Sequence, residues 1–64
     1  METKYIKATL VLKEWTYKDM ANHLNMNYET FRYKMKKGNF YVDALVTMSE
    51  ILGADVKYLI QGDK

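Results

Sequence analysis

The sequence predicts an all-α fold, a compact bundle of five short helices with a central helix-turn-helix. Three observations support this class. Apolar residues recur at the spacing of amphipathic helices along most of the chain. Proline is absent, and helices are expected to end at the only glycines, Gly38, Gly53 and Gly62. Hydrophobic residues make up 48% of the 64-residue chain, enough for one small core, so we expect a single domain over residues 1–64.

The first helix is expected from about Thr3 to Glu14. Its apolar stripe follows helical spacing and consists of Ile6, Leu10 and Val11. Trp15 comes directly after this segment and is large enough to anchor the first helix against the second.

A helix-turn-helix is predicted over about 16–36, with helices at roughly 16–24 and 28–36. Thr16 is a good N-cap, and Asp19 stands three residues later, where its carboxylate can accept from the amide of the cap. The turn needs a residue with positive φ, which Asn25 tolerates. The inward positions of the first of these helices are Met20, Ala21 and Leu24. These features also suit any pair of short helices in an all-α domain.

The second helix of the pair can be capped by Asn27, and Phe31 and Met35 would face inward. A fourth helix is expected from Val42 to Leu52, with Gly53 as its left-handed cap. Its apolar positions are Leu45, Met48, Ile51 and Leu52. Asp55 can cap a short last helix, Val56 to Ile60, which Gly62 would end.

The distribution of charge is more informative than the net charge, which is only +2. No acidic residue occurs from Thr30 to Val42, a segment with four cations, Arg32, Lys34, Lys36 and Lys37. A local excess of this kind is typical of phosphate binding, because cationic side chains neutralise the nucleic-acid backbone. A solvated lysine face is the alternative interpretation.

Several other functions find no support in the sequence. His23 is the only histidine and cysteine is absent, so neither a metal site nor a catalytic constellation is expected, and no cofactor or enzymatic activity is implied. The longest apolar run, Leu10 to Leu12, is far too short for a membrane span, and no signal-peptide core is present. We therefore expect a soluble, cytoplasmic protein.

From about Leu10 to Gly62 the chain resembles the phage repressor and Cro family of five-helix DNA-binding domains. The matching stretches are WTYKDMA at 15–21, LNMNYETF at 24–31 and ILGADVKYLIQG at 51–62. The resemblance implies a transcriptional regulator of repressor type, from a phage or prophage, that binds double-stranded DNA.

In this family the second helix of the pair enters the major groove, which here is the segment 28–36. The resemblance therefore implies base contacts by Tyr28, Glu29, Arg32 and Tyr33. It implies phosphate contacts by Thr16, Tyr17, Lys18, Lys36, Lys37 and Asn39. Arg32 is the best candidate for a bidentate contact to guanine. Glu29 could accept from a cytosine amino group or form a salt bridge with Arg32.

The resemblance also implies a symmetric homodimer on an inverted-repeat operator, formed in solution or only on DNA. Its interface is expected at Ala54, Val56, Tyr58 and Leu59. These residues could instead close the core, which is the preferred interpretation for Leu59. An alternative function is a protein-interaction module on the same scaffold, antitoxin-like or inhibitor-like, which exposed tyrosines at 28, 33 and 41 would favour. RNA binding is a weaker third possibility.

Overall fold

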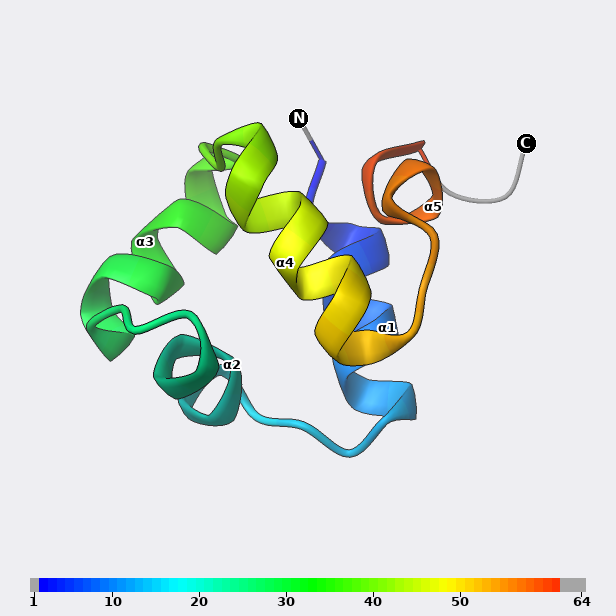
Figure 1. Ribbon diagram of the computed structural model, residues 1–64. Coiled ribbons are helices and arrows are strands. Elements are labelled where there is room, and N and C mark those ends of the chain that lie inside the picture. The colour runs from blue at the N-terminus through cyan, green and yellow to red at the C-terminus, as the bar shows by residue number, and fades with distance from the viewer. Residues whose placement is uncertain (1, 62–64) are drawn as a thin grey trace.

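Five α-helices are formed by residues 2–61, the part of the chain that the computed structural model describes. They are α1 (Lys4–Leu12), α2 (Tyr17–His23), α3 (Tyr28–Lys37), α4 (Val42–Leu52) and α5 (Val56–Gln61) (Figure 1). This confirms the all-α class and the order of the five elements. Gly62, which was expected to end the last helix, lies outside the described residues.

All five helices contribute to one core. Its buried apolar residues are Ile6, Leu10, Met20, Ala21, Phe31, Met35, Leu45, Met48, Leu52 and Leu59. Phe31 of α3 is fully buried, and its ring centroid lies 5.4 Å from that of Tyr17 and 5.5 Å from that of Phe40. The aromatic contacts attach α3 to α2 on one side and to the following loop on the other.

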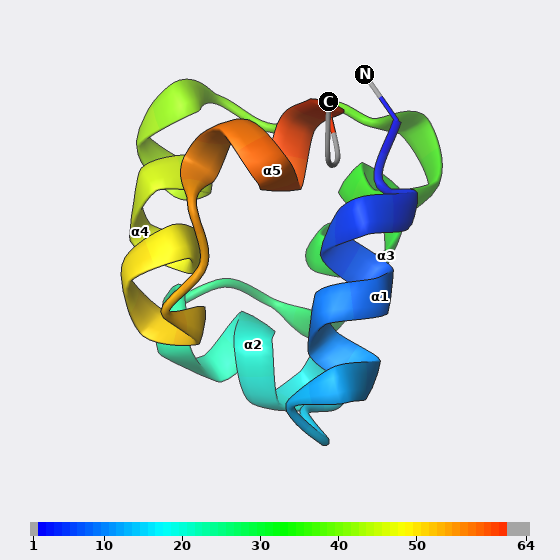
Figure 2. The same cartoon turned by 90° about the vertical axis from the view of Figure 1, so that its right-hand side faces the viewer.

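The helices are arranged so that α2 and α3 pack on each other, while α5 packs on α1 and α4. In Figure 1 the α2–α3 pair lies at one end of the molecule and α5 at the other. Figure 2 shows α5 lying between α4 and α1. The start of α1 meets the end of α3, where the Thr3 hydroxyl donates to the Met35 carbonyl. One side of α3, with Tyr28, Arg32 and Tyr33, is exposed to solvent.

Four helices end at a residue in the left-handed conformation: Glu14, Asn25, Gly38 and Gly53, with φ of 61°, 59°, 68° and 65°. After each of these residues, the next amide donates back to a carbonyl five residues earlier, as in Trp15 to Leu10 at 2.8 Å and Met26 to Ala21 at 2.8 Å. This is the hydrogen bond of the Schellman motif. The predicted left-handed turn at Asn25 is confirmed.

The first helix is shorter than predicted, since it ends at Leu12 and not near Glu14. The apolar pattern continues through Val11, but the left-handed Glu14 reverses the chain. Helix α3 extends to Lys37, one residue further than expected, because Gly38 caps it. Trp15 has the role predicted for it: it packs against the core, and its ring centroid lies 4.6 Å from that of His23 in α2.

Candidate nucleic-acid interface

The outward face of α3 carries the residues predicted to read bases. Phe31 and Met35 point into the core and fix the rotation of the helix. As a result Tyr28 and Tyr33 are 42% and 57% exposed, and the side chains of Arg32 and Glu29 are 63% and 74% exposed. The structure thus brings the four candidates together on one solvent-facing helix.

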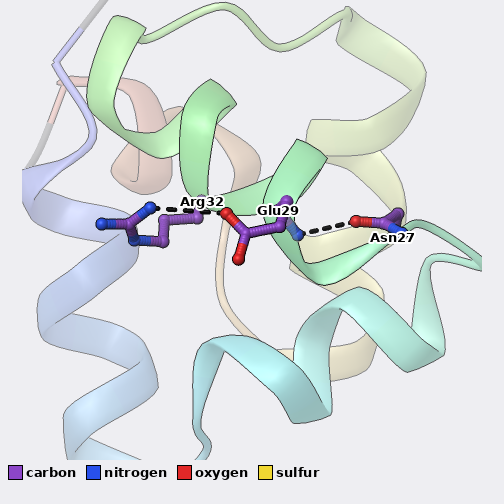
Figure 3. Close-up of polar contacts among 3 residues, drawn as sticks. All are labelled: Asn27, Glu29 and Arg32. Atoms are coloured by element: carbon purple, nitrogen blue, oxygen red, sulfur yellow. Dashed lines mark hydrogen bonds and ion pairs between the residues drawn. The ribbon is translucent and has the colours of Figure 1, made fainter.

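The start of α3 is fixed by Asn27, whose side-chain oxygen accepts from the amide of Glu29 at 2.8 Å. The Glu29 carboxylate in turn lies 3.4 Å from a guanidinium nitrogen of Arg32 (Figure 3). This salt bridge is the alternative that the sequence left open for Glu29. Both groups are exposed, so the pair stabilises the helix by only a few tenths of a kcal/mol. Arg32 can therefore leave Glu29 at little cost.

The lysines at the end of α3 point in different directions. Lys34 donates to the carbonyl of Asn39 at 3.3 Å and lies 5.4 Å from the ring centroid of Tyr41, which directs it toward the loop after α3. Lys37 lies 6.0 Å from the ring centroid of Tyr33, on the outward face. Lys36 is exposed on the side of α3 that faces α1. The basic segment is therefore split over three sides of the helix.

The start of α2 is closed by a reciprocal capping box, as predicted. The amide of Asp19 donates to the Thr16 hydroxyl oxygen at 3.0 Å, and the amide of Thr16 donates to the Asp19 carboxylate at 2.9 Å. The backbone hydrogen bond from Thr16 lowers the pKa of Asp19 below 3.8, so the carboxylate is charged at neutral pH. Two of the amides at this end of α2 are therefore engaged within the capping box.

Tyr17 is half-buried and its ring meets that of Phe31 edge-on. Burial raises the pKa of Tyr17 above 10.0, and the charge of Tyr28 adds to the effect. The phenol is therefore protonated at neutral pH and can donate a hydrogen bond. Lys18 and Asn39 are also predicted to contact phosphates, and both are exposed.

A tie between α1 and α3 was not foreseen from the sequence. The hydroxyl of Thr3 donates to the carbonyl of Met35, 32 positions further along the chain, at 2.6 Å. Met35 belongs to the last turn of α3, where carbonyls lack an intrahelical partner. A threonine in an N-terminal segment carries no signal for such a distant acceptor.

The residues expected at a dimer interface do not all lie on the surface. Leu59 is fully buried in the core, the alternative that the sequence left open, so it offers nothing to a partner. Ala54 and Val56 are partly buried against the core. Tyr58 is 36% exposed and its ring centroid lies 5.8 Å from that of Tyr5.

Among residues 2–61, no group of three or more histidine, aspartate or glutamate side chains could hold a metal ion. In the same range no helix has the length and apolarity needed to cross a bilayer.

Two helices joined by a left-handed turn, the second presenting a polar and basic outward face, define a helix-turn-helix DNA-binding domain. Residues 1–38 match the family model of bacterial regulatory proteins of the Fis family, and the chain belongs to this family. It is a DNA-binding transcription regulator whose partner is double-stranded DNA. Neither the curated proteins nor the solved structures gave a match.

Proposed function

We propose that this protein is a sequence-specific transcriptional regulator of repressor type, which reads DNA with α3 in the major groove. The observation that carries the proposal is the outward face of α3, where Arg32 stands among Tyr28, Glu29 and Tyr33 on a helix whose opposite face is locked by Phe31. In this proposal the 64 residues act as one DNA-binding domain.

The dimensions of α3 suit this role. Its 10 residues span about 15 Å, and a major groove about 12 Å wide admits such a helix end-on or lengthwise. Arg32 exchanges its weak pairing with Glu29 for a bidentate contact to guanine O6 and N7. Tyr28 and Tyr33 offer hydroxyl groups and ring faces to neighbouring bases, and Glu29 either accepts from a cytosine or orients Arg32.

Phosphate contacts would hold α2 across the backbone and leave sequence reading to α3. We assign them to Thr16, Tyr17, Lys18, Lys36, Lys37 and Asn39. The protonated Tyr17 phenol and the Thr16 hydroxyl can both donate to phosphate oxygens. Lys37 is near the end of α3 on the outward side, where its ammonium group can reach a phosphate.

The proposal that the protein is of the phage repressor type rests on the stretches 15–21, 24–31 and 51–62, of which the last lies beyond the family match. Residues 1–38 include α1, α2 and α3, whereas α4 and α5 follow the match. The stretch 51–62 resembles the closing segment of phage repressors, and its described part forms the end of α4, the Gly53 cap and α5.

We also propose a homodimer on an inverted repeat, through the surface formed by Ala54, Val56 and Tyr58. The molecule measures 31 × 22 × 19 Å, so two copies side by side can place their α3 helices about one DNA turn apart, or about 34 Å. Leu59 is left out of this surface because it is buried.

A protein-interaction role is favoured by the exposure of Tyr28, Tyr33 and Tyr41. DNA binding accounts for the first two, because they flank Arg32 on α3. Tyr41 is 76% exposed, and the Lys34 ammonium group lies 5.4 Å from its ring centroid. DNA binding therefore explains more of the surface than an antitoxin-like or inhibitor-like role does.

The test is Arg32→Ala, titrated against a duplex that the wild-type protein binds. We expect a loss of roughly 1 to 3 kcal/mol in binding free energy and weaker discrimination at one base pair. Lys37→Ala should instead weaken binding to all duplexes and flatten the salt dependence. Lys13→Ala, at the far end of α1, is the charge-matched control. Unchanged affinity and base preference in Arg32→Ala would show that α3 does not read DNA through this residue.

A further inference from the structure

A cleft of about 660 Å³ lies between the start of α1 and the outward side of α3. Four cationic side chains line it: Lys4 and Lys7 from α1, and Arg32 and Lys36 from α3. Nothing in the fold requires four positive charges to converge here, since all four side chains are exposed and could diverge into solvent.

The charges in this cleft are only partly compensated. Lys4 lies 3.3 Å from Glu2, and Arg32 lies 3.4 Å from Glu29. Within residues 2–61, Lys7 and Lys36 have no acidic partner. The excess positive charge is therefore carried by one lysine from each wall, an arrangement that suits a single phosphate group between them.

The cleft is continuous with the surface that reads DNA in the proposed function. Arg32 and Tyr33 belong to both, because they line the cleft and also lie on the outward face of α3. When α3 occupies the major groove, one of the two backbones that border the groove runs along the α1 side of this helix. A backbone phosphate, and not a base edge, then meets Lys7 and Lys36.

The position of α1 against α3 is held firmly enough to present these lysines. The Thr3 hydroxyl donates to the Met35 carbonyl, and the Lys7 amide donates to the Thr3 carbonyl at 2.9 Å. Ile6, next to Lys7, is fully buried and fixes the rotation of α1. Lys7 therefore lies at the edge of the cleft, on a helix turn that these hydrogen bonds and the burial of Ile6 hold in place.

We propose that α1 is part of the DNA interface and that the α1–α3 cleft binds one backbone phosphate through Lys7 and Lys36. The inference rests on the proposed function, to which it adds a third helix. Lys7 contributes affinity without sequence preference, because a phosphate is the same at every base pair.

The experiment measures DNA affinity against salt concentration for wild type, Lys7→Gln, Lys7→Arg and the control Lys13→Gln. Loss of one phosphate contact should reduce the slope of log K against log salt by about 0.9 in Lys7→Gln. Between 50 and 200 mM salt, wild type should therefore lose about three- to fourfold more affinity than Lys7→Gln. Lys7→Arg and Lys13→Gln should keep the wild-type slope, and base preference should be unchanged in all variants.

Duplexes with a single neutral methylphosphonate linkage locate the contact. One position in each half-site should weaken wild type but leave Lys7→Gln unaffected. If wild type binds and Arg32→Ala binds more weakly and with relaxed base preference, yet Lys7→Gln behaves like Lys13→Gln, the inference about α1 is wrong and the proposed function stands. If wild type binds no duplex, both are wrong. Circular dichroism melting checks that Lys7→Gln is folded, as expected for an exposed side chain without an ion pair.

Discussion

Single residues in the left-handed conformation determine where α1, α2, α3 and α4 end. Two of the four are glycines, which adopt positive φ without a steric penalty, and Asn25 adopts it at modest cost. Glu14 has neither advantage, and its φ of 61° places a β-carbon against the preceding turn. Among these four positions, Glu14 therefore has the greatest backbone strain.

Glu14→Gly should stabilise the protein. Removal of the left-handed penalty outweighs the greater chain entropy of glycine in the unfolded state, for a net gain of roughly 0.5 to 1 kcal/mol. Asn25→Ala, at nearly the same φ, should destabilise the protein by about 1 kcal/mol. Urea unfolding of both variants measures the two effects. Destabilisation by Glu14→Gly would indicate that the Glu14 side chain makes a contact worth more than the strain.

The Asp19 carboxylate makes the stability of the folded protein depend on pH in the acidic range. Its pKa is lowered in the folded state by the hydrogen bond from the Thr16 amide, so its contribution is complete at pH values above the ordinary 3.8 and is lost as pH falls through the lowered value. Asp19→Asn keeps an acceptor but removes the charge. Its urea midpoint should lie below that of wild type at neutral pH, and the gap should close below pH 3.8. A gap that stays constant with pH would contradict this account.

At the scale of elements, a hydrogen bond from Thr3 to the Met35 carbonyl ties the start of α1 to α3. Thr3→Val removes the donor at nearly constant shape and should cost about 1 kcal/mol in the free energy of unfolding. Thr47→Val is the matched control, because the Thr47 hydroxyl donates within its own helix, to the carbonyl of Asp43 at 2.9 Å, and is exposed. If Thr3→Val and Thr47→Val lowered the free energy of unfolding equally, the Thr3–Met35 hydrogen bond would contribute no more than the bond within α4 does.

The elements themselves could be predicted because their signals are local. Asn27 and the Thr16–Asp19 capping box start their helices where expected, and Asn25 and Gly53 end theirs. The directions of the lysine side chains could not be predicted from the sequence. Lys34 turns toward a loop carbonyl, and Lys36 turns toward α1. These directions follow from tertiary neighbours that no spacing rule reveals. The exposed face of α3 was predictable, because Phe31 and Met35 mark its buried side.

At the scale of the whole molecule, the fold separates two surfaces. The α2–α3 pair and the adjoining start of α1 form the side proposed to face DNA, and α5 packs on α1 and α4 to one side of this pair (Figure 1). The exposed part of α5, with Tyr58, is therefore free for a second copy while α3 lies in the groove. Burial of Leu59 in the core, the interpretation preferred from the sequence, is confirmed. Local spacing did not show that α5 packs on α1 and α4.

The central claim is that α3 reads DNA sequence, and selection of bound duplexes from a random pool at low ionic strength tests it most directly. We predict enrichment of an inverted repeat with half-site centres about 10 base pairs apart, and loss of the preference at one base pair of each half-site with Arg32→Ala. Enrichment of single half-sites would refute the dimer alone. A folded wild-type protein that enriches no motif would contradict the account.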